Sequence, residues 1–130
     1  MEIKNLNELA AEIHQNAVAH GWWEEDRSIP EVLMLCVSEL AEALEEYRED
    51  QPTVWYACNT TGQRCGECTG KDKDCPRRSP KPEGIAVEMA DCIIRILDWC
   101  GKEGVDIDAI ISAKHEYNKS RPYRHGGKKC

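Results

Sequence analysis

Two groups of acidic side chains recur at helical spacing and could bind a divalent cation. Glu39, Glu42 and Glu46 are spaced i, i+3 and i+7, so on a helix all three lie on one face. Glu88 and Asp91 repeat the i, i+3 spacing further along the chain. Carboxylate oxygens are the ligands that Mg²⁺ and Mn²⁺ prefer. Two helices with facing carboxylates would therefore form an oxygen-lined metal site.

A solvated face or an ion-pair network could explain the same acids without a metal. The glutamates near position 42, taken alone, are typical of a solvated face. The segment around Glu88 is apolar almost all round, which is typical of a buried helix, and buried carboxylates are costly unless they are paired or metal-bound. Arg95 could pair with them. The two groups together favour the metal. The apolar residues are Ile85, Val87, Met89, Ile93, Ile94, Ile96 and Leu97.

The side chains of another predicted helix, near the C-terminus, are basic or polar instead of acidic. Lys114, Asn118 and Arg121 are spaced i, i+4 and i+7 on one predicted helix face. Such a face suits contacts with anionic groups such as phosphates. The alternative is a solvated basic helix end that complements the helix dipole.

Aromatic side chains offer candidate contacts to a nucleobase. Trp22 or Trp23 could stack on a base, since aromatic faces bind bases tolerantly. The alternative is that both tryptophans pack as core or interface residues. His14 could also reach a base, or be an ordinary surface histidine. Trp55 and Trp99 are assigned to packing.

Half of the eight cysteines form a spaced cluster. Cys58, Cys65, Cys68 and Cys75 read C-x6-C-x2-C-x6-C, and four thiolates so close in sequence can enclose a structural Zn²⁺. Disulfides and unligated thiols are the alternatives. The remaining helical cysteines are expected to be small core residues: Cys36, Cys92 and Cys100.

The elements that must position these residues are four predicted helices, over about 5–20, 30–50, 83–101 and from 106 or 108 to about 120. No convincing strand alternation is present, so the fold class is all-α. Residues 51–82 lack periodicity and are interpreted as an insertion. On the second helix the expected core stripe is Leu33, Val37, Leu40, Leu44 and Tyr47.

The 130 residues predict one domain over 1–130. No apolar run is long enough for a membrane span, and the acidic N-terminus does not resemble a secretory signal, so a cytoplasmic protein is expected. In such a protein the cysteines favour metal binding or free thiols. The formal net charge of −7 argues against a general nucleic-acid binder.

The pair Glu39-x-x-Glu42 and Glu88-x-x-Asp91 resembles the ExxE…ExxD signature of the MazG-like all-α NTP pyrophosphohydrolases. The similarity extends over AHGWWEEDRSIPEVLMLCVSELAEALEEYRED and KHEYNKSRPYRHGGKK, most of the chain outside the insertion. The chain departs from the family in the 45 residues, 43–87, between the two pairs, a longer spacing than is usual.

This resemblance implies a helical bundle of four to five helices that hydrolyses a nucleoside triphosphate, an NTP or dNTP, to the monophosphate and pyrophosphate. The implied Mg²⁺ ligands are Glu39, Glu42, Glu88 and Asp91. It also implies a homo-oligomer, either a dimer or a tetramer. A spare carboxylate, Glu42 or Glu46, could act as general base towards water.

The leading hypothesis is therefore a Mg²⁺-dependent NTP pyrophosphohydrolase that cleanses or adjusts a nucleotide pool. One alternative is a zinc-loop binding module for nucleic acid or protein, with a helical scaffold. Another is a nucleotide-binding regulator without turnover. The basic residues of the zinc-loop alternative are Arg64, Lys71, Lys73, Arg77, Arg78 and Lys81.

Overall fold

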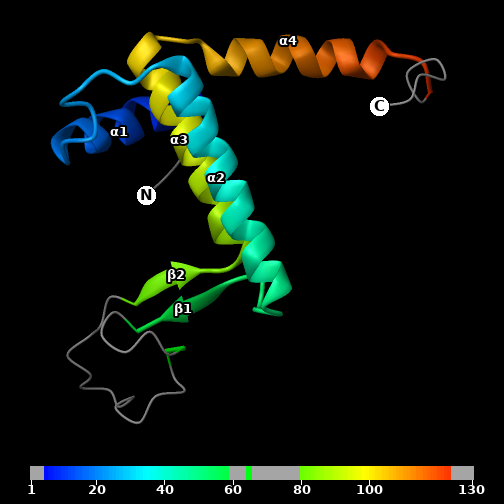
Figure 1. Cartoon of the computed structure of the whole chain (residues 1–130). Helices are drawn as coiled ribbons and strands as arrows, with labels where there is room; N and C mark the ends of the chain where they lie inside the picture. Colours follow the sequence, from blue (N-terminus) through cyan, green and yellow to red (C-terminus); the bar gives the residue numbers. More distant parts are fainter. Residues whose placement is uncertain (1–4, 59–63, 66–79, 124–130) are drawn as a thin grey trace. The chain divides into compact units, whose positions relative to one another are not determined.

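The computed structural model describes residues 5–58, 64–65 and 80–123, and the chain divides into two compact units. The first unit is Met1–Glu25 with Leu97–Cys130, and the second is Asp26–Ile96. The four predicted helices are confirmed within about two residues of most of their expected ends, and a small two-stranded sheet accompanies them (Figure 1). The elements are α1 (Leu6–Ala19), α2 (Ile29–Arg48), β1 (Trp55–Ala57), β2 (Lys81–Glu83), α3 (Ile85–Glu103) and α4 (Ile107–Ser120).

The first unit has a small apolar core. Ala10 of α1 and Leu97 and Cys100 of α3 are each only 2–3% exposed. Gly101 lets α1 and the end of α3 approach closely, because a Cβ at that position would lie 2.5 Å from the carbonyl oxygen of Ala10. Packed around these three residues are Leu6, Leu9, Ile13, Trp99, Val105 and Ile107.

Hydrogen bonds fasten α1 to α4 in the same unit. The carboxylate of Asp108 accepts from the backbone N–H groups of Leu6 and Asn7, at 3.2 and 3.1 Å. In return, the side-chain oxygen of Asn7 accepts from the N–H of Ile107 at 3.0 Å. A carboxylate at a helix N-terminus satisfies unpaired N–H groups and complements the helix dipole. Each helix therefore caps the other.

The second unit pairs α2 with the first part of α3, and here one prediction is wrong. The expected core stripe of α2, called the apolar stripe below, is 47–67% exposed in the single chain. The residues of α2 that are buried lie one position earlier and form the buried stripe: Val32, Cys36, Glu39, Ala43 and Glu46. Both stripes have the 4-3-4-3 spacing of a helix seam, so periodicity alone could not distinguish them.

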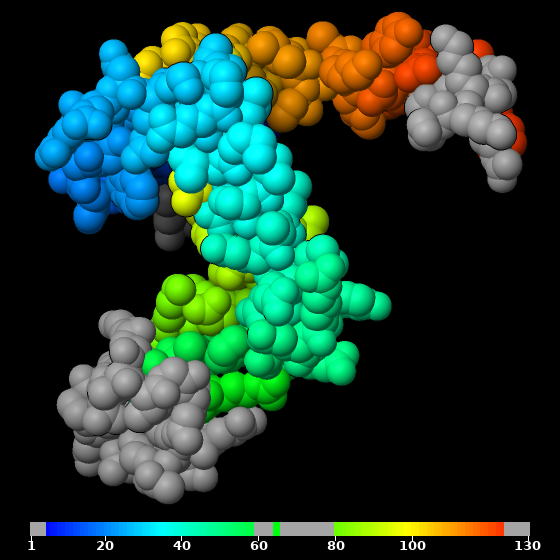
Figure 2. Space-filling model, in the orientation of Figure 1, coloured from blue at the N-terminus to red at the C-terminus, as the bar shows by residue number. Residues whose placement is uncertain are grey.

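The apolar surface of α3 shows the same departure from expectation. Met89, Ile93, Ile94 and Ile96 are exposed, although the sequence predicts a buried helix. The physical reason is that two helices side by side bury only the narrow strip between them. In the space-filling view α2, in cyan, has no other segment of its unit in front of it (Figure 2).

The ends of the predicted insertion form a short antiparallel ribbon, which the all-α prediction missed. Trp55 lies opposite Glu83, and Ala57 lies opposite Lys81. Strands of three residues are too short to show alternation in a sequence. The ribbon joins α3 through Gly84, which has φ +116°, and any Cβ there would lie 2.3 Å from the carbonyl oxygen of Thr53. Only glycine fits this junction.

No described helix combines the length and apolar character needed to cross a bilayer.

Candidate metal centre

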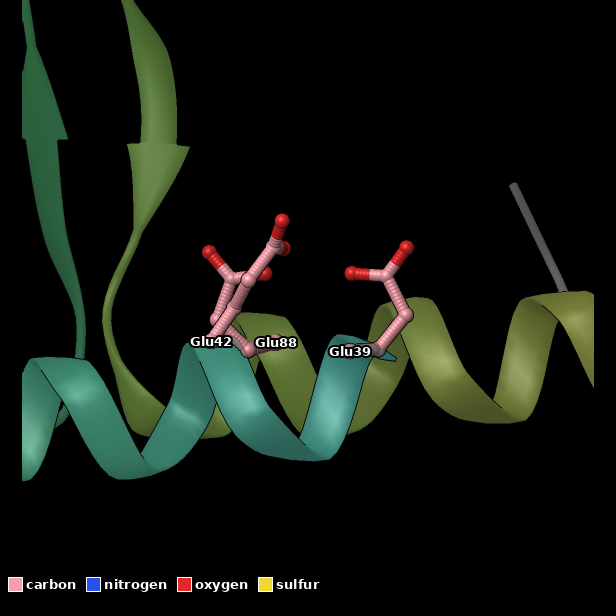
Figure 3. A group of neighbouring side chains, drawn as sticks. All are labelled: Glu39, Glu42 and Glu88. Carbon is pink, nitrogen blue, oxygen red and sulfur yellow. The ribbon is translucent and has the colours of Figure 1, made fainter. Parts of the chain in front are cut away.

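Three glutamates of the second unit converge on one point. One carboxylate oxygen from each of Glu39, Glu42 and Glu88 lies within 4.8 Å of the others, and we call these residues the acidic cluster. Figure 3 shows the three side chains rising from the same side of the α2–α3 pair. The structure thus brings together three of the four acids predicted as Mg²⁺ ligands.

Local structure explains this convergence. Glu39 and Glu42 are one turn apart on α2, so their side chains lie on one face. Glu88 is in the first turn of α3, where its N–H donates to the carbonyl oxygen of Gly84 at 3.0 Å. The glycine junction therefore sets where α3 begins, and with it the position of Glu88. Glu39 and Glu88 are each 7% exposed, whereas Glu42 is open to solvent.

Burial and mutual repulsion change the acidity of the cluster. Burial, followed by the neighbouring carboxylate of Glu42, raises the pKa of Glu88 to about 8. A hydrogen bond with Glu39 is the largest cause of a raised pKa at Glu42. Burial and the crowding of carboxylates therefore both disfavour full ionisation of the cluster.

Arg95 supplies part of the neutralising charge. Its Nε donates to Oε1 of Glu39 at 2.6 Å, so the ion pair considered from the sequence is present. Burial alone would raise the pKa of Glu39, but the hydrogen bonds with Arg95 and Glu42 outweigh it and lower the pKa. Arg95 therefore compensates the carboxylate of Glu39, while the pKa values of Glu42 and Glu88 stay raised.

Asp91, the fourth predicted ligand, lies near this group but is not a member of it. Burial and then the charge of Glu39 raise the pKa of its carboxyl group. Asp91 is one turn after Glu88 on α3, so it lies on the same side of that helix.

A second group of acids adjoins the first. Glu46 and Glu83 each place a carboxylate oxygen within 4.8 Å of the other and of Glu88. The indole N–H of Trp55 donates to Oε1 of Glu46 at 3.0 Å. Lys81 pairs with Glu83 at 3.0 Å, and this contact is the largest cause of the raised pKa of Lys81.

Glu83 was not identified as a site residue from the sequence, and Lys81 was named only among the basic residues of the zinc-loop alternative. Both lie at the end of the aperiodic segment 51–82 or just after it, where no spacing argument applies. The only available signal was the position of Glu83 two residues before the start of α3.

The donor set suits a hard divalent cation. Every ligand atom in the acidic cluster is a carboxylate oxygen, which Mg²⁺ and Mn²⁺ prefer over nitrogen or sulfur. A cation would also favour the ionised form of Glu88, whose pKa is raised by burial and by the neighbouring carboxylate of Glu42. The residues present therefore fit such an ion.

The first unit holds the predicted base contacts. Nδ1 of His14 lies 2.8 Å from Oδ1 of Asp98, and the indole N–H of Trp23 donates to both oxygens of that carboxylate at 3.0 and 3.1 Å. The ammonium group of Lys102 lies 5.2 Å from the Trp23 ring centre. Asp98 thus holds both His14 and Trp23 in place. Trp22, the third candidate, is 51% exposed.

The predicted phosphate contacts lie on α4 and at its end. Lys114 and Asn118 are exposed, and Arg121 follows the helix as its C-cap. The Lys114 ammonium lies 4.8 Å and the Arg121 guanidinium 5.8 Å from the ring centre of Tyr117. Lys114 and Asn118 therefore share a helix face, while Arg121 follows the helix with extended backbone and approaches the same ring as Lys114.

The cysteine cluster falls only partly within the described residues. Cys58 is buried and Cys65 is exposed, while Cys68 and Cys75 lie outside the described part of the chain. Of the basic residues in the zinc-loop alternative, only Arg64 and Lys81 are described. The helical cysteines Cys36, Cys92 and Cys100 are buried as expected.

Comparison of this chain with known protein families, curated proteins and solved structures gives no match.

Proposed function

We propose that the protein is a Mg²⁺-dependent nucleoside triphosphate pyrophosphohydrolase, with Mn²⁺ as a possible substitute. The observation that carries the proposal is the convergence of Glu39, Glu42 and Glu88 from two helices, with two of the three carboxylates buried. Buried carboxylates without enough compensating charge are costly, and a bound cation would relieve that cost. Asp91 is the proposed fourth ligand.

The proposed reaction is a hydrolytic cleavage between the first two phosphates. The oxygen of a water molecule bonds to the α-phosphorus, and the bond from that phosphorus to the bridging oxygen of the β-phosphate breaks. The products are the monophosphate and pyrophosphate. When bound, the cation neutralises charge on the phosphate oxygens and makes water more acidic.

Glu46 is the better of the two candidate bases. Glu42 belongs to the proposed ligand set, whereas Glu46 lies outside it and still approaches Glu88. Trp55 orients the Glu46 carboxylate by donating to Oε1, so the water proton would go to Oε2. The base stands beside the ion site rather than in it.

Lys114, Asn118 and Arg121 are the proposed phosphate and sugar contacts, with Trp22, Trp23 and His14 as candidate base contacts. These six residues all belong to the first unit. Their assignment rests on the resemblance and on the exposed basic face of α4.

The exposed apolar stripe supports association of the chain with a second copy. Its residues Leu33, Val37, Leu40, Leu44 and Tyr47 are spaced as in a coiled-coil seam, yet each is about half exposed or more. Contiguous apolar surface of this kind marks an interface. We propose that two copies bury these stripes against each other, as a dimer or as part of a tetramer.

The proposed activity is tested by incubating the protein with each common NTP and dNTP and Mg²⁺, and measuring pyrophosphate and monophosphate. We expect equal amounts of the two products, and no reaction after chelation of the metal. Glu42→Gln should remove the activity with the fold intact, since it deletes one ligand. Glu45→Gln is the matched control, because Glu45 is an exposed neighbour on α2 outside both acidic groups.

Release of orthophosphate instead of pyrophosphate would show a different reaction. Binding of nucleotide without any product would identify a regulator rather than an enzyme.

A structural Zn²⁺ held by Cys58, Cys65, Cys68 and Cys75 is a separate proposal. Metal analysis of protein purified under reducing conditions should give about one zinc per chain. A zinc content near zero would show that these cysteines do not bind zinc.

A further inference from the structure

A pocket on the ribbon lies beside the acidic groups and has no role in the proposal above. Its volume is about 460 Å³, which is within the range of ligand sites, roughly 300–1,000 Å³. The described residues that line it are Trp55, Tyr56, Arg64, Cys65 and Pro80. All belong to the second unit, as does the acidic cluster.

The walls of this ribbon pocket suit a flat, uncharged ring. The guanidinium of Arg64 lies 5.9 Å from the ring centre of Trp55, and it also donates to Oε1 of Gln51 at 2.6 Å. Arg64 is thus held in place beside an aromatic face. Tyr56, next to Trp55 on β1, adds a second ring, and it is about half exposed. Aromatic and guanidinium planes stack on nucleobases with little dependence on sequence.

One side chain connects the ribbon pocket to the acidic groups. Trp55 lines the pocket and donates its indole N–H to Glu46, whose carboxylate lies within 4.8 Å of that of Glu88. Figure 3 shows the two strands leaving the helices on the side to which the acidic cluster points. A triphosphate bound at the carboxylates would therefore have an aromatic pocket within the reach of a nucleotide.

Lys81 lies on the ribbon next to the second acidic group. It is paired with Ala57 across the ribbon, and its ammonium contacts Glu83 of the second acidic group. The charges of Glu88 and Glu42 also raise the pKa of Lys81, so the ammonium group interacts electrostatically with the acidic cluster. A lysine placed there could neutralise a phosphate next to the metal.

We propose that the ribbon pocket binds the nucleobase of the triphosphate, with Trp55, Tyr56 and Arg64 as base contacts and Lys81 as a phosphate contact. This inference rests on the proposed function and makes the insertion the source of base binding. Trp55, assigned to packing from the sequence, gains a second role. The rival base contacts Trp22 and Trp23 lie in the first unit.

The test compares binding of two probes by calorimetry in Mg²⁺: each of the four deoxynucleoside monophosphates, and inorganic tripolyphosphate. Tyr56→Ala and Arg64→Ala should weaken monophosphate binding about 5- to 150-fold, the equivalent of one lost stacking contact. Neither should change tripolyphosphate binding more than about twofold, because that probe has no base. Trp55→Phe should keep monophosphate affinity but lower kcat, since it keeps the ring and loses the donor to Glu46.

Val54→Ala is the matched control, because Val54 is an exposed residue immediately before β1 and is not among the described residues that line the pocket. Unchanged monophosphate binding in Tyr56→Ala and Arg64→Ala would overturn the inference and leave the proposed function intact. Loss of binding in Trp22→Ala alone would overturn it in favour of the first unit. A wild-type protein that binds neither probe would contradict the proposed function itself.

Discussion

Both units bury apolar side chains, but among the described residues only the second unit also buries carboxylates. In the first, Ala10, Leu97 and Cys100 are the most buried side chains, and all are apolar or weakly polar. In the second, the strip between α2 and α3 buries Glu39, Glu46 and Glu88. An apolar core lowers the free energy of the folded chain, whereas buried carboxylates raise it unless they are compensated. The buried residues of the first unit thus stabilise the fold. The buried carboxylates of the second unit destabilise it unless they are compensated, as a bound cation would do.

The largest expected effect is on the acidic cluster. Glu88→Gln should lower pyrophosphate release at least about 100-fold, since a bound cation contributes several kcal/mol of charge stabilisation. The same change should leave the metal-free thermal midpoint unchanged or raise it, because it removes a buried group that resists ionisation. Activity and calorimetric unfolding measure the two effects. A fall in the midpoint similar to that of a core deletion would show that Glu88 is structural.

In the first unit, a core substitution is expected to lower stability instead. Leu97→Ala should lower the free energy of unfolding by about 2–5 kcal/mol, because it leaves a cavity beside Ala10 and Cys100. Urea titration followed by circular dichroism measures this loss. Ile110→Ala, on the exposed side of α4, is the control and should cost much less. An equal loss of unfolding free energy in both variants would show that Leu97 does not belong to the stabilising core.

The apolar stripe gives a test of the proposed association. Leu40→Asp should convert the oligomer to monomer, because each buried leucine contributes about 1.5–3 kcal/mol and a buried charge opposes contact. Analytical ultracentrifugation reports the mass of the species in solution. Ala41→Asp carries the same charge one residue along and should stay associated. A wild-type chain that sediments as a monomer at high concentration would remove the proposal.

The smallest and most gradual effect is on pH dependence. Burial raises the pKa of Glu88 from its ordinary value of 4.5 to about 8, so between these pH values the folded chain holds a proton that the unfolded chain has lost. The metal-free chain should therefore lose stability as the pH rises from about 4.5 towards 8. Mg²⁺ affinity should rise over the same range, because the proton must leave. Glu88→Gln should flatten the dependence of stability on pH. If the dependence were unchanged in this variant, another titrating group would be its cause.

The sequence predicted the helices well because their periodicity and caps are local. Ser28, for example, accepts from the N–H of Glu31 at 3.3 Å, as a capping residue does. It also predicted that Glu39, Glu42 and Glu88 belong together, from spacing and from resemblance.

The sequence could not show which side of α2 is buried within one chain. Leu40 and Glu39 belong to two seams of equal period, and hydrophobicity alone favours burial of the leucine. In the structure Glu39 is buried and Leu40 is exposed. Glu83 was missed for another reason, since its position depends on pairing with Trp55 across the ribbon. Such a pairing between distant residues leaves no periodic trace.

The junction at Gly84 also bears on how this chain could change length. Because Trp55 and Glu83 lie opposite each other, the chain leaves and returns to the helices at neighbouring points. The entropy of closing a loop grows only with the logarithm of its length, about 0.6 kcal/mol per doubling. Residues could therefore be gained or lost beyond Ala57 and Lys81 at little cost to the acidic cluster. The ribbon is therefore a position at which segments can be inserted without changing α2 and α3.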